Sequence, residues 1–343
     1  MTDRYHRQAL FAPIGGEGQR LLQSKKVAII GLGALGASLA QMAARAGIGH
    51  LVLVDRDVVE LTNLQRQILY TEEDVKEQLP KAVAAQEHLK AINSEITIEA
   101  HVSDLNAENA DDLLQDCDLI LDGTDNFATR YLINDVAVKH HIPWIYGAAV
   151  RSQGAVATII PGVTPCFQCL FPQAPVASID TCDTAGVISP IIQIVTAYQM
   201  TEAMKILTGH VETIRSQLLH VDPWYGLHYQ MDTTKQKKVD CPCCGKHHFH
   251  FLDNRMNQPI TSVLCGRDTV QIRVPHRQQL NFTQLEERLQ ESGSIHRTPH
   301  FLQFKPTEYA GLTLTVFQDG RVLLHGITDP DEALSLYRKL IGL

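Results

Sequence analysis

The sequence predicts an α/β protein with a doubly wound, mostly parallel sheet and a small α+β appendage at the C-terminal end. Continuous apolar runs such as Val27–Ile30 are typical of parallel strands that are covered on both faces. Strand and helix patterns then alternate to about residue 150, as in a doubly wound sheet. After Cys244 the sequence becomes polar and rich in turns, which indicates a domain boundary.

The first strand–helix–strand unit spans residues 27–55. We expect a buried strand at Val27–Ile30, a helix of small residues to about Ala46, and a second buried strand that ends at Asp55. The turn between the first strand and the helix has the spacing G-x-G-x-x-G, formed by Gly31, Gly33 and Gly36.

The later elements continue this alternation. The expected helices are Lys81–Ile92, Asn106–Leu114, Asn126–His140 and Thr184–Leu207. The expected strands are 96–102, 118–123, 142–149 and 154–162. In the appendage, residues 260–343, we expect strands at Val270–Val274, Leu312–Phe317 and Val322–Leu324 and helices at Phe282–Glu291 and Asp331–Ile341.

The composition is that of an ordinary globular protein of about two domains, with 343 residues, 44% hydrophobic and 20% charged. A net charge of -8 argues against a broad nucleic-acid or anionic-membrane surface. The charged N-terminus has no signal-peptide core, and the apolar stretch Val27–Ala40 is too short to span a bilayer. We therefore expect a cytoplasmic protein, in which paired cysteines indicate metal binding or catalysis rather than disulfides.

The glycine-rich turn predicts a nucleotide site. Its glycines allow a phosphate to approach the backbone, and the following helix offers free N–H groups and a partial positive charge. Asp55, at the end of the next strand, can accept a hydrogen bond from a ribose hydroxyl. The alternative, a tight turn that binds nothing, is disfavoured by the flanking strand, helix and acid.

Further polar groups follow at successive strand ends and favour a triphosphate over a dinucleotide. Arg66 has a planar fork of donors that suits phosphate, and Lys81 supplies a point charge at the start of a helix. Asp125 and Asn126 follow the strand that ends near residue 122, where ligands collect in open α/β sheets. Asp125 is a candidate ligand for Mg²⁺, which prefers oxygen atoms.

An ordered set of motifs resembles the ThiF/MoeB/HesA adenylyltransferases, the bacterial relatives of ubiquitin-activating enzymes. The similarity covers about residues 4–245 and rests on RYHRQ (4–8), GLGALG (31–36), VDRD (54–57), TNLQRQ (62–67), PKA (80–82), DGTDN (122–126), TPCFQCL (164–170), TCDTAGV (181–187) and CPCCG (241–245). The resemblance implies an adenylyltransferase domain at 1–248, with a Rossmann-like core at about 25–160 and a zinc-tied part at about 160–248. The role of residues 260–343 stays open.

This resemblance implies ATP-dependent adenylation of the C-terminal glycine of a ubiquitin-like sulfur carrier that ends in Gly-Gly. The carrier would be the small subunit of molybdopterin synthase or the thiamine carrier ThiS, with a sulfur donor such as a cysteine desulfurase as a further partner. The implied nucleotide and phosphate residues are Gly31, Gly33, Gly36, Asp55, Asn63, Gln65, Arg66, Lys81, Asp125 and Asn126. Arg7 matches an arginine that reaches the partner subunit's site in family dimers, which implies a homodimer.

One departure from the family concerns the stretch DVKEQLPKA, residues 74–82. Family members usually have a glycine shortly before the Pro-Lys pair, and this chain has none there. We expect Lys81 to keep its role, but the pattern does not give the path of the loop before it.

The cysteines predict a structural zinc site. Two C-x-x-C pairs, separated by 71 residues, supply four thiolates for tetrahedral zinc: Cys166, Cys169, Cys241 and Cys244. Cys243 is expected to be a bystander, with competition as a zinc ligand left open. Cys265 is expected to be structural, and the histidines of KHHFHF (246–251) to lie in a solvated turn. Cys182 precedes a long helix, which would favour its thiolate; a covalent link to the carrier and a loop cysteine without a catalytic role both remain open.

Two other functions are consistent with parts of the sequence. An NAD-dependent oxidoreductase would explain residues 31–55 but would leave Arg66, Lys81 and the four cysteines without a role. A related enzyme that adenylates a different peptide would use the same residues, and only its substrate would distinguish it.

Overall fold

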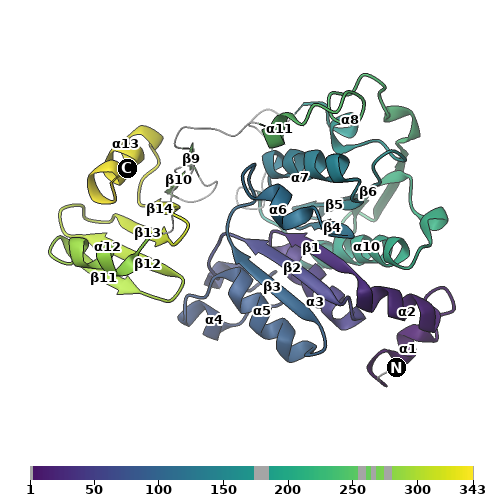
Figure 1. The fold of residues 1–343 in the computed structure, drawn as a ribbon, viewed down its shortest axis with the longest axis horizontal. Coiled ribbons are helices and arrows are strands. Elements are labelled where there is room, and N and C mark those ends of the chain that lie inside the picture. The colour runs from purple at the N-terminus through teal and green to yellow at the C-terminus, as the bar shows by residue number, and fades with distance from the viewer. Residues whose placement is uncertain (1–2, 174–184, 254–259, 264–267, 274–279, 343) are drawn as a thin grey trace. The chain divides into compact units, whose positions relative to one another are not determined.

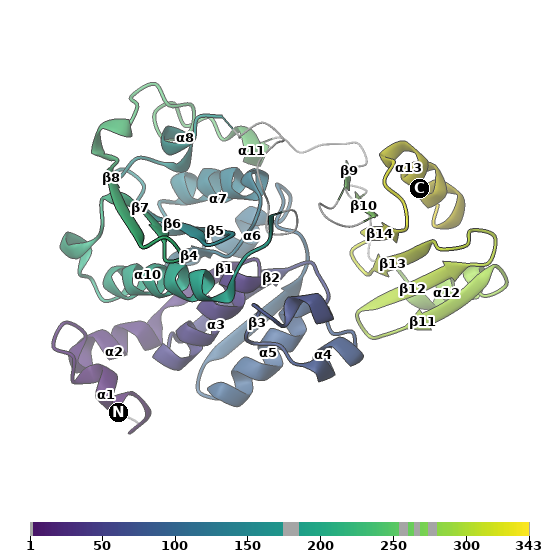
Figure 2. The same cartoon turned by 180° about the vertical axis from the view of Figure 1, so that it is seen from behind.

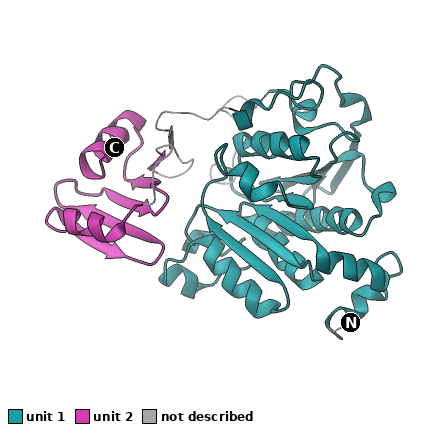
Figure 3. Ribbon diagram, in the orientation of Figure 1, with its two compact units in different colours: residues 1–254 teal, residues 255–343 magenta. Residues whose placement is uncertain are grey.

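The computed structural model describes residues 3–173, 185–253, 260–263, 268–273 and 280–342. The chain divides into two compact units, residues 1–254 and 255–343, which Figure 3 shows in different colours. Cys182 and Cys265 lie outside the described residues. Within the described part of the chain, no helix has the length and apolar character needed to cross a membrane.

The first unit is built on one eight-stranded sheet with the order β3-β2-β1-β4-β5-β6-β7-β8. Strands β1 to β5 are parallel, and β6, β7 and β8 pair antiparallel at one end. The strands are β1 (Lys26–Ile30), β2 (His50–Asp55), β3 (Thr97–Val102), β4 (Leu119–Asp122), β5 (Trp144–Val150), β6 (Gln153–Ile159), β7 (Gln217–Asp222) and β8 (Leu227–Asp232).

Helices cover both faces of this sheet (Figure 1). One face packs against α3 (Ala34–Ala46), α5 (Lys81–Ile92) and α10 (Ser189–Leu207). The other packs against α6 (Ala110–Leu114) and α7 (Phe127–His140). The shorter helices are α1 (His6–Ala9), α2 (Gly15–Ser24), α4 (Glu72–Lys76), α8 (Phe167–Leu170) and α11 (His250–Asp253), with 3₁₀ turns at Asp3–Tyr5, Leu61–Asn63, Val211–Thr213 and Thr234–Gln236.

The central strands are apolar throughout because both faces are buried. In β1, Val27 and Ile29 enter the core beneath α3, whereas Ala28 and Ile30 enter the core beneath α7. This alternation is the geometric reason that the parallel strands read as continuous apolar runs. The fold class predicted from the sequence, a mostly parallel Rossmann-like sheet, is confirmed.

The second unit has its own antiparallel sheet, with the order β11-β12-β13-β14-β10-β9. Two helices with strongly amphipathic sequences, α12 and α13, pack on one face and close a separate core. The elements are β9 (Ile260–Val263), β10 (Thr269–Arg273), α12 (Phe282–Leu289), β11 (Gly293–Arg297), β12 (Phe301–Pro306), β13 (Thr313–Phe317), β14 (Val322–His325) and α13 (Pro330–Leu340).

Two expected helices begin later than predicted. The helix expected from Asn106 starts at Ala110, because the Asn106 side chain accepts a hydrogen bond from Glu108 N and the Asn109 side chain accepts one from Asn106 N. Such side-chain bonds stabilise a turn in place of a helix. The helix expected from Thr184, which lies outside the described residues, has its long regular part from Ser189.

Candidate nucleotide site and metal centre

The three glycines of the turn after β1 have different physical roles. Gly31 adopts φ +79°, and a Cβ there would lie 2.8 Å from Gly123 O. A Cβ on Gly36 would lie 1.7 Å from Gly31 O, so this glycine is required for the close packing of α3. Gly33 has φ -68° and ψ -147°, a combination outside the regions that residues with a side chain ordinarily adopt, and the nearest atom to its Cβ position is Gln67 Nε2 at 3.9 Å. Glycine therefore suits the backbone at this position, and no side chain fills the space at the N-terminus of α3.

Asp55 is fixed beside this turn. Its carboxylate accepts hydrogen bonds from Leu32 N (2.6 Å) and from Asp57 N (2.7 Å). Burial raises the pKa of Asp55 above its ordinary value, and the charge of Lys81 partly offsets this effect. The carboxylate is thus held in place at the end of β2, where a ribose is expected.

Lys81 begins α5 and reaches the same edge of the sheet. Its Nζ lies 3.2 Å from Asp57 Oδ2, and its side chain is only 5% exposed. The backbone fixes this pair, because Lys81 N donates to Asp57 O (2.8 Å) and Val59 N donates to Leu79 O (2.9 Å). The sequence did not reveal Asp57 as a member of the site, although it lies two residues after Asp55.

The loop before Lys81 contains a residue with a strained backbone conformation. Gln78 has φ +54°, the left-handed conformation that glycine adopts most easily. It follows Glu77, the C-cap residue of α4, where such a conformation commonly ends a helix. Gln78 therefore ends α4 in this conformation without a glycine, and the loop brings Lys81 to Asp57.

The polar side chains of residues 63–67 differ in burial and in hydrogen bonding. Asn63 is 1% exposed, and its Oδ1 accepts a hydrogen bond from Glu60 N, so it closes the 3₁₀ turn. Arg66 donates from Nη1 to Thr62 O and stays half-buried, and Gln65 is exposed. Gln67 is buried against the glycine turn. The sequence alone did not indicate this burial. The ligand contacts predicted for Asn63, Gln65 and Arg66 stay predictions.

The loop after β4 is held by hydrogen bonds of Asp122 and Arg130, and it exposes Asp125. Asp122 is fully buried and binds Arg130 Nε at 2.9 Å. Arg130 also donates to Thr124 O (2.6 Å), and this hydrogen bond ties the loop to α7. Asn126 caps α7 by accepting a hydrogen bond from Thr129 N, which occupies its side-chain oxygen. Asp125 is thus presented at the edge where Mg²⁺ was expected.

Arg56 and Asp104 form an ion pair that the sequence did not indicate. Arg56 Nη1 lies 3.0 and 3.2 Å from the two carboxylate oxygens of Asp104, which follows β3. Burial alone would lower the pKa of Arg56, but Asp104, Asp57 and Asp125 together raise it above its ordinary value. The strand ends therefore gather carboxylates from three loops around one guanidinium, which limits their mutual repulsion.

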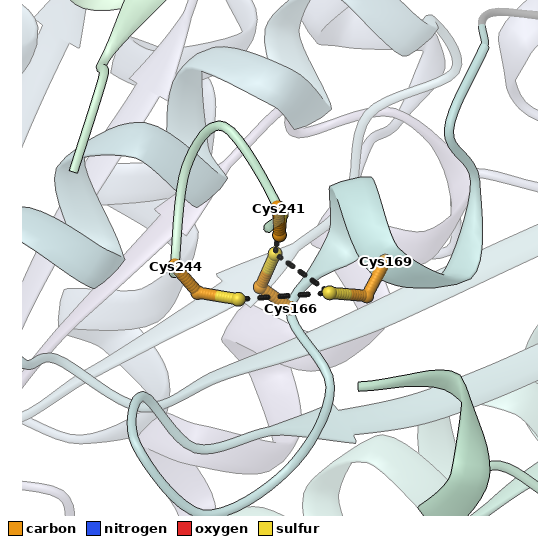
Figure 4. A group of neighbouring side chains, drawn as sticks. All are labelled: Cys166, Cys169, Cys241 and Cys244. Atoms are coloured by element: carbon orange, nitrogen blue, oxygen red, sulfur yellow. Dashed lines mark hydrogen bonds between the residues drawn. The ribbon is translucent and has the colours of Figure 1, made fainter. Parts of the chain in front are cut away.

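Four cysteine sulfurs meet at one point between α8 and the segment 241–244 (Figure 4). All four lie within 4.8 Å of one another, and the closest S–S distances are 3.6 Å (Cys166–Cys241 and Cys169–Cys244) and 3.8 Å (Cys166–Cys169). Tetrahedral zinc with bonds of about 2.3 Å would place sulfurs about 3.8 Å apart. The sulfur positions and donor chemistry therefore fit a four-coordinate zinc ion.

The neighbouring residues are arranged around this cluster. Cys243 is fully buried but accepts a hydrogen bond from Asn134 Nδ2 (3.2 Å) and does not belong to the group of four. The side chains of His247, His248 and His250 are exposed, in agreement with the solvated turn expected there. The roles considered for Cys182 stay predictions, since it lies outside the described residues.

Arg7 lies on the short helix α1 and is exposed. The segment before it is anchored, because Tyr5 is 2% exposed and its hydroxyl accepts a hydrogen bond from Asn93 Nδ2 (2.8 Å). Arg7 is therefore presented outward from a fixed support, together with the exposed side chains of Leu10 and Phe11.

Residues 5–243 match the model of the ThiF family. The chain belongs to the ThiF family. It is 43% identical over 343 residues to the sulfur carrier protein ThiS adenylyltransferase of Bacillus subtilis, covering all of both chains. It is 39% identical over 249 residues to the sulfur carrier protein adenylyltransferase of Thermus thermophilus, covering 71% of this chain and 90% of that protein.

Solved structures of this fold include Escherichia coli MccB with ATP, with a TM-score of 0.61, 21% sequence identity, and coverage of 71% of this chain and 75% of that one. At this identity the likeness concerns the fold alone. The match to the B. subtilis relative extends through the second unit, whereas the match to the T. thermophilus relative covers a length close to that of the first unit.

Proposed function

We propose that this ThiF-family protein adenylates the C-terminal carboxylate of a ubiquitin-like sulfur carrier with ATP. The observation that carries the proposal is the gathering of Gly33, Asp55 and Lys81 at one sheet edge, in a chain 43% identical over its whole length to a ThiS adenylyltransferase. An NAD-dependent oxidoreductase would need none of the cationic groups that follow Asp55.

The chemistry requires positioning and charge stabilisation. An oxygen of the carrier carboxylate forms a bond to the α-phosphorus of ATP, the bond from that phosphorus to the bridging oxygen breaks, and pyrophosphate leaves. A carboxylate is already ionised at neutral pH, so no general base is needed. Lys81 and Arg66 would stabilise the charge that develops on the phosphates, and Asp125 would hold Mg²⁺.

The preferred carrier is expected to be of the ThiS type rather than the molybdopterin type. The full-length match to a protein named for ThiS includes the second unit, residues 255–343. The sulfur needed after adenylation would come from a separate donor such as a cysteine desulfurase. A cytoplasmic location would keep the four clustered thiols reduced and able to bind zinc.

The edge strand β8 supplies a surface for the carrier. Leu227, Tyr229 and Met231 are 40%, 56% and 61% exposed and point to the same side, because alternate residues of a strand share a face. Trp224 and Tyr225, in the turn before β8, are each 71% exposed. Figure 2 shows β8 at the edge of the sheet. Contiguous exposed apolar side chains mark protein-binding surfaces, and we expect an apolar face of the carrier to contact them.

Substitutions on the two faces of β8 test whether the carrier binds this surface. Tyr229→Glu should raise the KM for the carrier about tenfold, since it places a charge in an apolar contact, and should leave the KM for ATP unchanged. Gln230→Glu changes the same strand on its other face and should leave both KM values unchanged. An unchanged carrier KM in Tyr229→Glu would exclude β8 from the interface.

The active enzyme is proposed to be a homodimer in which Arg7 reaches the partner subunit's nucleotide. Arg7→Ala and Arg66→Ala homodimers should each have little activity, but mixed dimers would contain one site with both arginines intact. Random mixing should then restore about a quarter of wild-type activity. If Arg7 acts within its own subunit, the mixture will stay inactive.

The four-cysteine cluster is proposed to hold a structural zinc ion, since four protein ligands leave no coordination position for substrate. When bound, the ion would cross-link segments 166–169 and 241–244 and would take no part in the reaction at the phosphates.

ATP–pyrophosphate exchange tests the proposed reaction. We expect exchange that requires a carrier ending in Gly-Gly and Mg²⁺, with a lower KM for a ThiS-type carrier than for a molybdopterin-type carrier. Exchange with neither carrier would reject the reaction. Exchange with the molybdopterin type alone would keep the reaction and reject the proposed carrier preference.

A further inference from the structure

The Gln67 carboxamide has no role in the interactions described above. The residue is 3% exposed, and its Oε1 is buried without a hydrogen-bond partner in the described part of the chain. A buried acceptor without a partner lowers the stability of a protein, and such groups in native structures commonly have a functional reason. Gln67 is thus suited to a partner that arrives from outside the protein.

The backbone of Gln67 is firmly held against the glycine turn. Its N–H donates to Asn63 O (2.9 Å), and its carbonyl accepts from Tyr70 N (3.2 Å). The Tyr70 hydroxyl in turn donates to Leu32 O (2.8 Å), inside the glycine turn. The backbone position of Gln67 is therefore set by the fold before any ligand binds.

The carboxamide borders the open space over Gly33. Its Nε2 is 3.9 Å from the position that a Cβ on Gly33 would take. Apart from Gly33 and its two neighbours in the chain, no other described atom lies within 4 Å of that position. Gly33 also caps α3, a helix of 13 residues whose first N–H groups favour a phosphate. An anion in this space would lie between the helix N-terminus and Gln67.

We propose that Gln67 donates a hydrogen bond from its carboxamide to a phosphate oxygen of the nucleotide over Gly33, and so is a nucleotide-binding residue. This inference rests on the proposed function, in which ATP occupies this site. A bound nucleotide satisfies both ends of the carboxamide, because its phosphate oxygens accept from the amide and a ribose hydroxyl or a water molecule donates to the oxygen.

The test replaces Gln67 by a side chain of similar length that cannot hydrogen-bond. Gln67→Met should weaken ATP binding about tenfold, measured by calorimetry, because one hydrogen bond to a charged group is lost. Its Tm should stay equal or rise, because a buried acceptor without a partner is removed. A purely structural glutamine would give the opposite pair of results, a lower Tm and unchanged ATP binding.

Gln86 provides the matched control. Its Nε2 donates to Ile98 O (2.7 Å), so its hydrogen bond is internal to the protein. Gln86→Met should therefore lower the Tm and leave ATP binding unchanged. If Gln67→Met does not fold, Gln67→Asn, which keeps the carboxamide but shortens its reach, should show the same loss of ATP binding.

The outcomes separate this inference from the proposed function. Tight ATP binding by the wild type with weakened binding by the Gln67 variant supports both. Equal ATP binding by the wild type and Gln67→Met overturns the role of Gln67 and leaves the proposed function intact. A wild-type protein that does not bind ATP overturns the proposed function and this inference with it.

Discussion

The glycine turn and the four-cysteine cluster both bring distant residues together, but they do so by different means. Around the glycine turn, backbone hydrogen bonds and close packing set the geometry, as in the contact of Gly36 with Gly31 O and the bonds of Asp55 to Leu32 N. At the cysteine cluster, segments 166–169 and 241–244 meet through thiol side chains around a small core. The first site should be formed without its ligand, whereas the second should depend on its metal.

The largest expected effect is the loss of a zinc ligand. Cys169→Ser should abolish zinc binding and lower the free energy of unfolding by about 4 kcal/mol or more, because metal binding contributes directly to folding. Elemental analysis and urea denaturation would measure both effects. Cys243→Ser, beside the cluster but outside it, should keep the metal. Full zinc content in Cys169→Ser would show that the ligand set is wrong.

A comparison of two glycine variants tests the turn itself. Gly36→Ala should lower the free energy of unfolding by about 3 kcal/mol, since its Cβ would lie 1.7 Å from Gly31 O. Gly33→Ala should lower the free energy of unfolding by only about 1 kcal/mol, the cost of the unusual backbone conformation at this position, but should strongly weaken ATP binding, because its methyl group enters the phosphate space. Equal destabilisation of the two variants, measured by urea denaturation, would contradict the separate roles assigned to them.

Arg66→Ala addresses a residue that the fold does not need. The variant should retain wild-type stability and lose about 10- to 100-fold in kcat/KM for ATP, because Arg66 bonds only its own turn within the described structure and is expected to bind phosphate. Exchange kinetics and thermal denaturation would separate the two effects. Wild-type kinetics in this variant would remove Arg66 from the site.

The smallest expected effect concerns Gln78. Gln78→Gly should raise the free energy of unfolding by about 1 kcal/mol, because glycine adopts the left-handed conformation without steric strain. Activity should not change, since the backbone hydrogen bond from Lys81 N to Asp57 O holds Lys81 in place. A destabilised Gly variant, by urea denaturation, would show that the Gln78 side chain contributes more than its backbone costs.

The sequence predicted those parts of the structure that follow from local pattern. Apolar runs identified the parallel strands, the glycine spacing identified the nucleotide turn, and the bounds of α5, Lys81–Ile92, were predicted correctly. The paired cysteines were recognised because C-x-x-C spacing reflects the geometry of metal ligands. These features depend on residues that are close together in the chain.

The parts that were missed depend on distant contacts. The Arg56–Asp104 pair joins the loops after β2 and β3, and the burial of Gln67 depends on how residues 61–70 fold over the glycine turn. Neither periodicity nor composition contains the information on these two contacts. The hairpin β7–β8 was also not predicted, although residues 227–232 alternate between apolar and polar side chains as a strand does.

Intact mass spectrometry of the carrier tests the central claim most directly. A ThiS-type carrier incubated with the wild-type protein, ATP and Mg²⁺ should gain one adenylyl group, and a carrier without its C-terminal glycine should gain none. Arg66→Ala should greatly reduce the modified fraction. An unmodified carrier, under conditions in which the wild-type protein binds both the carrier and ATP, would contradict adenylation as the reaction of this site.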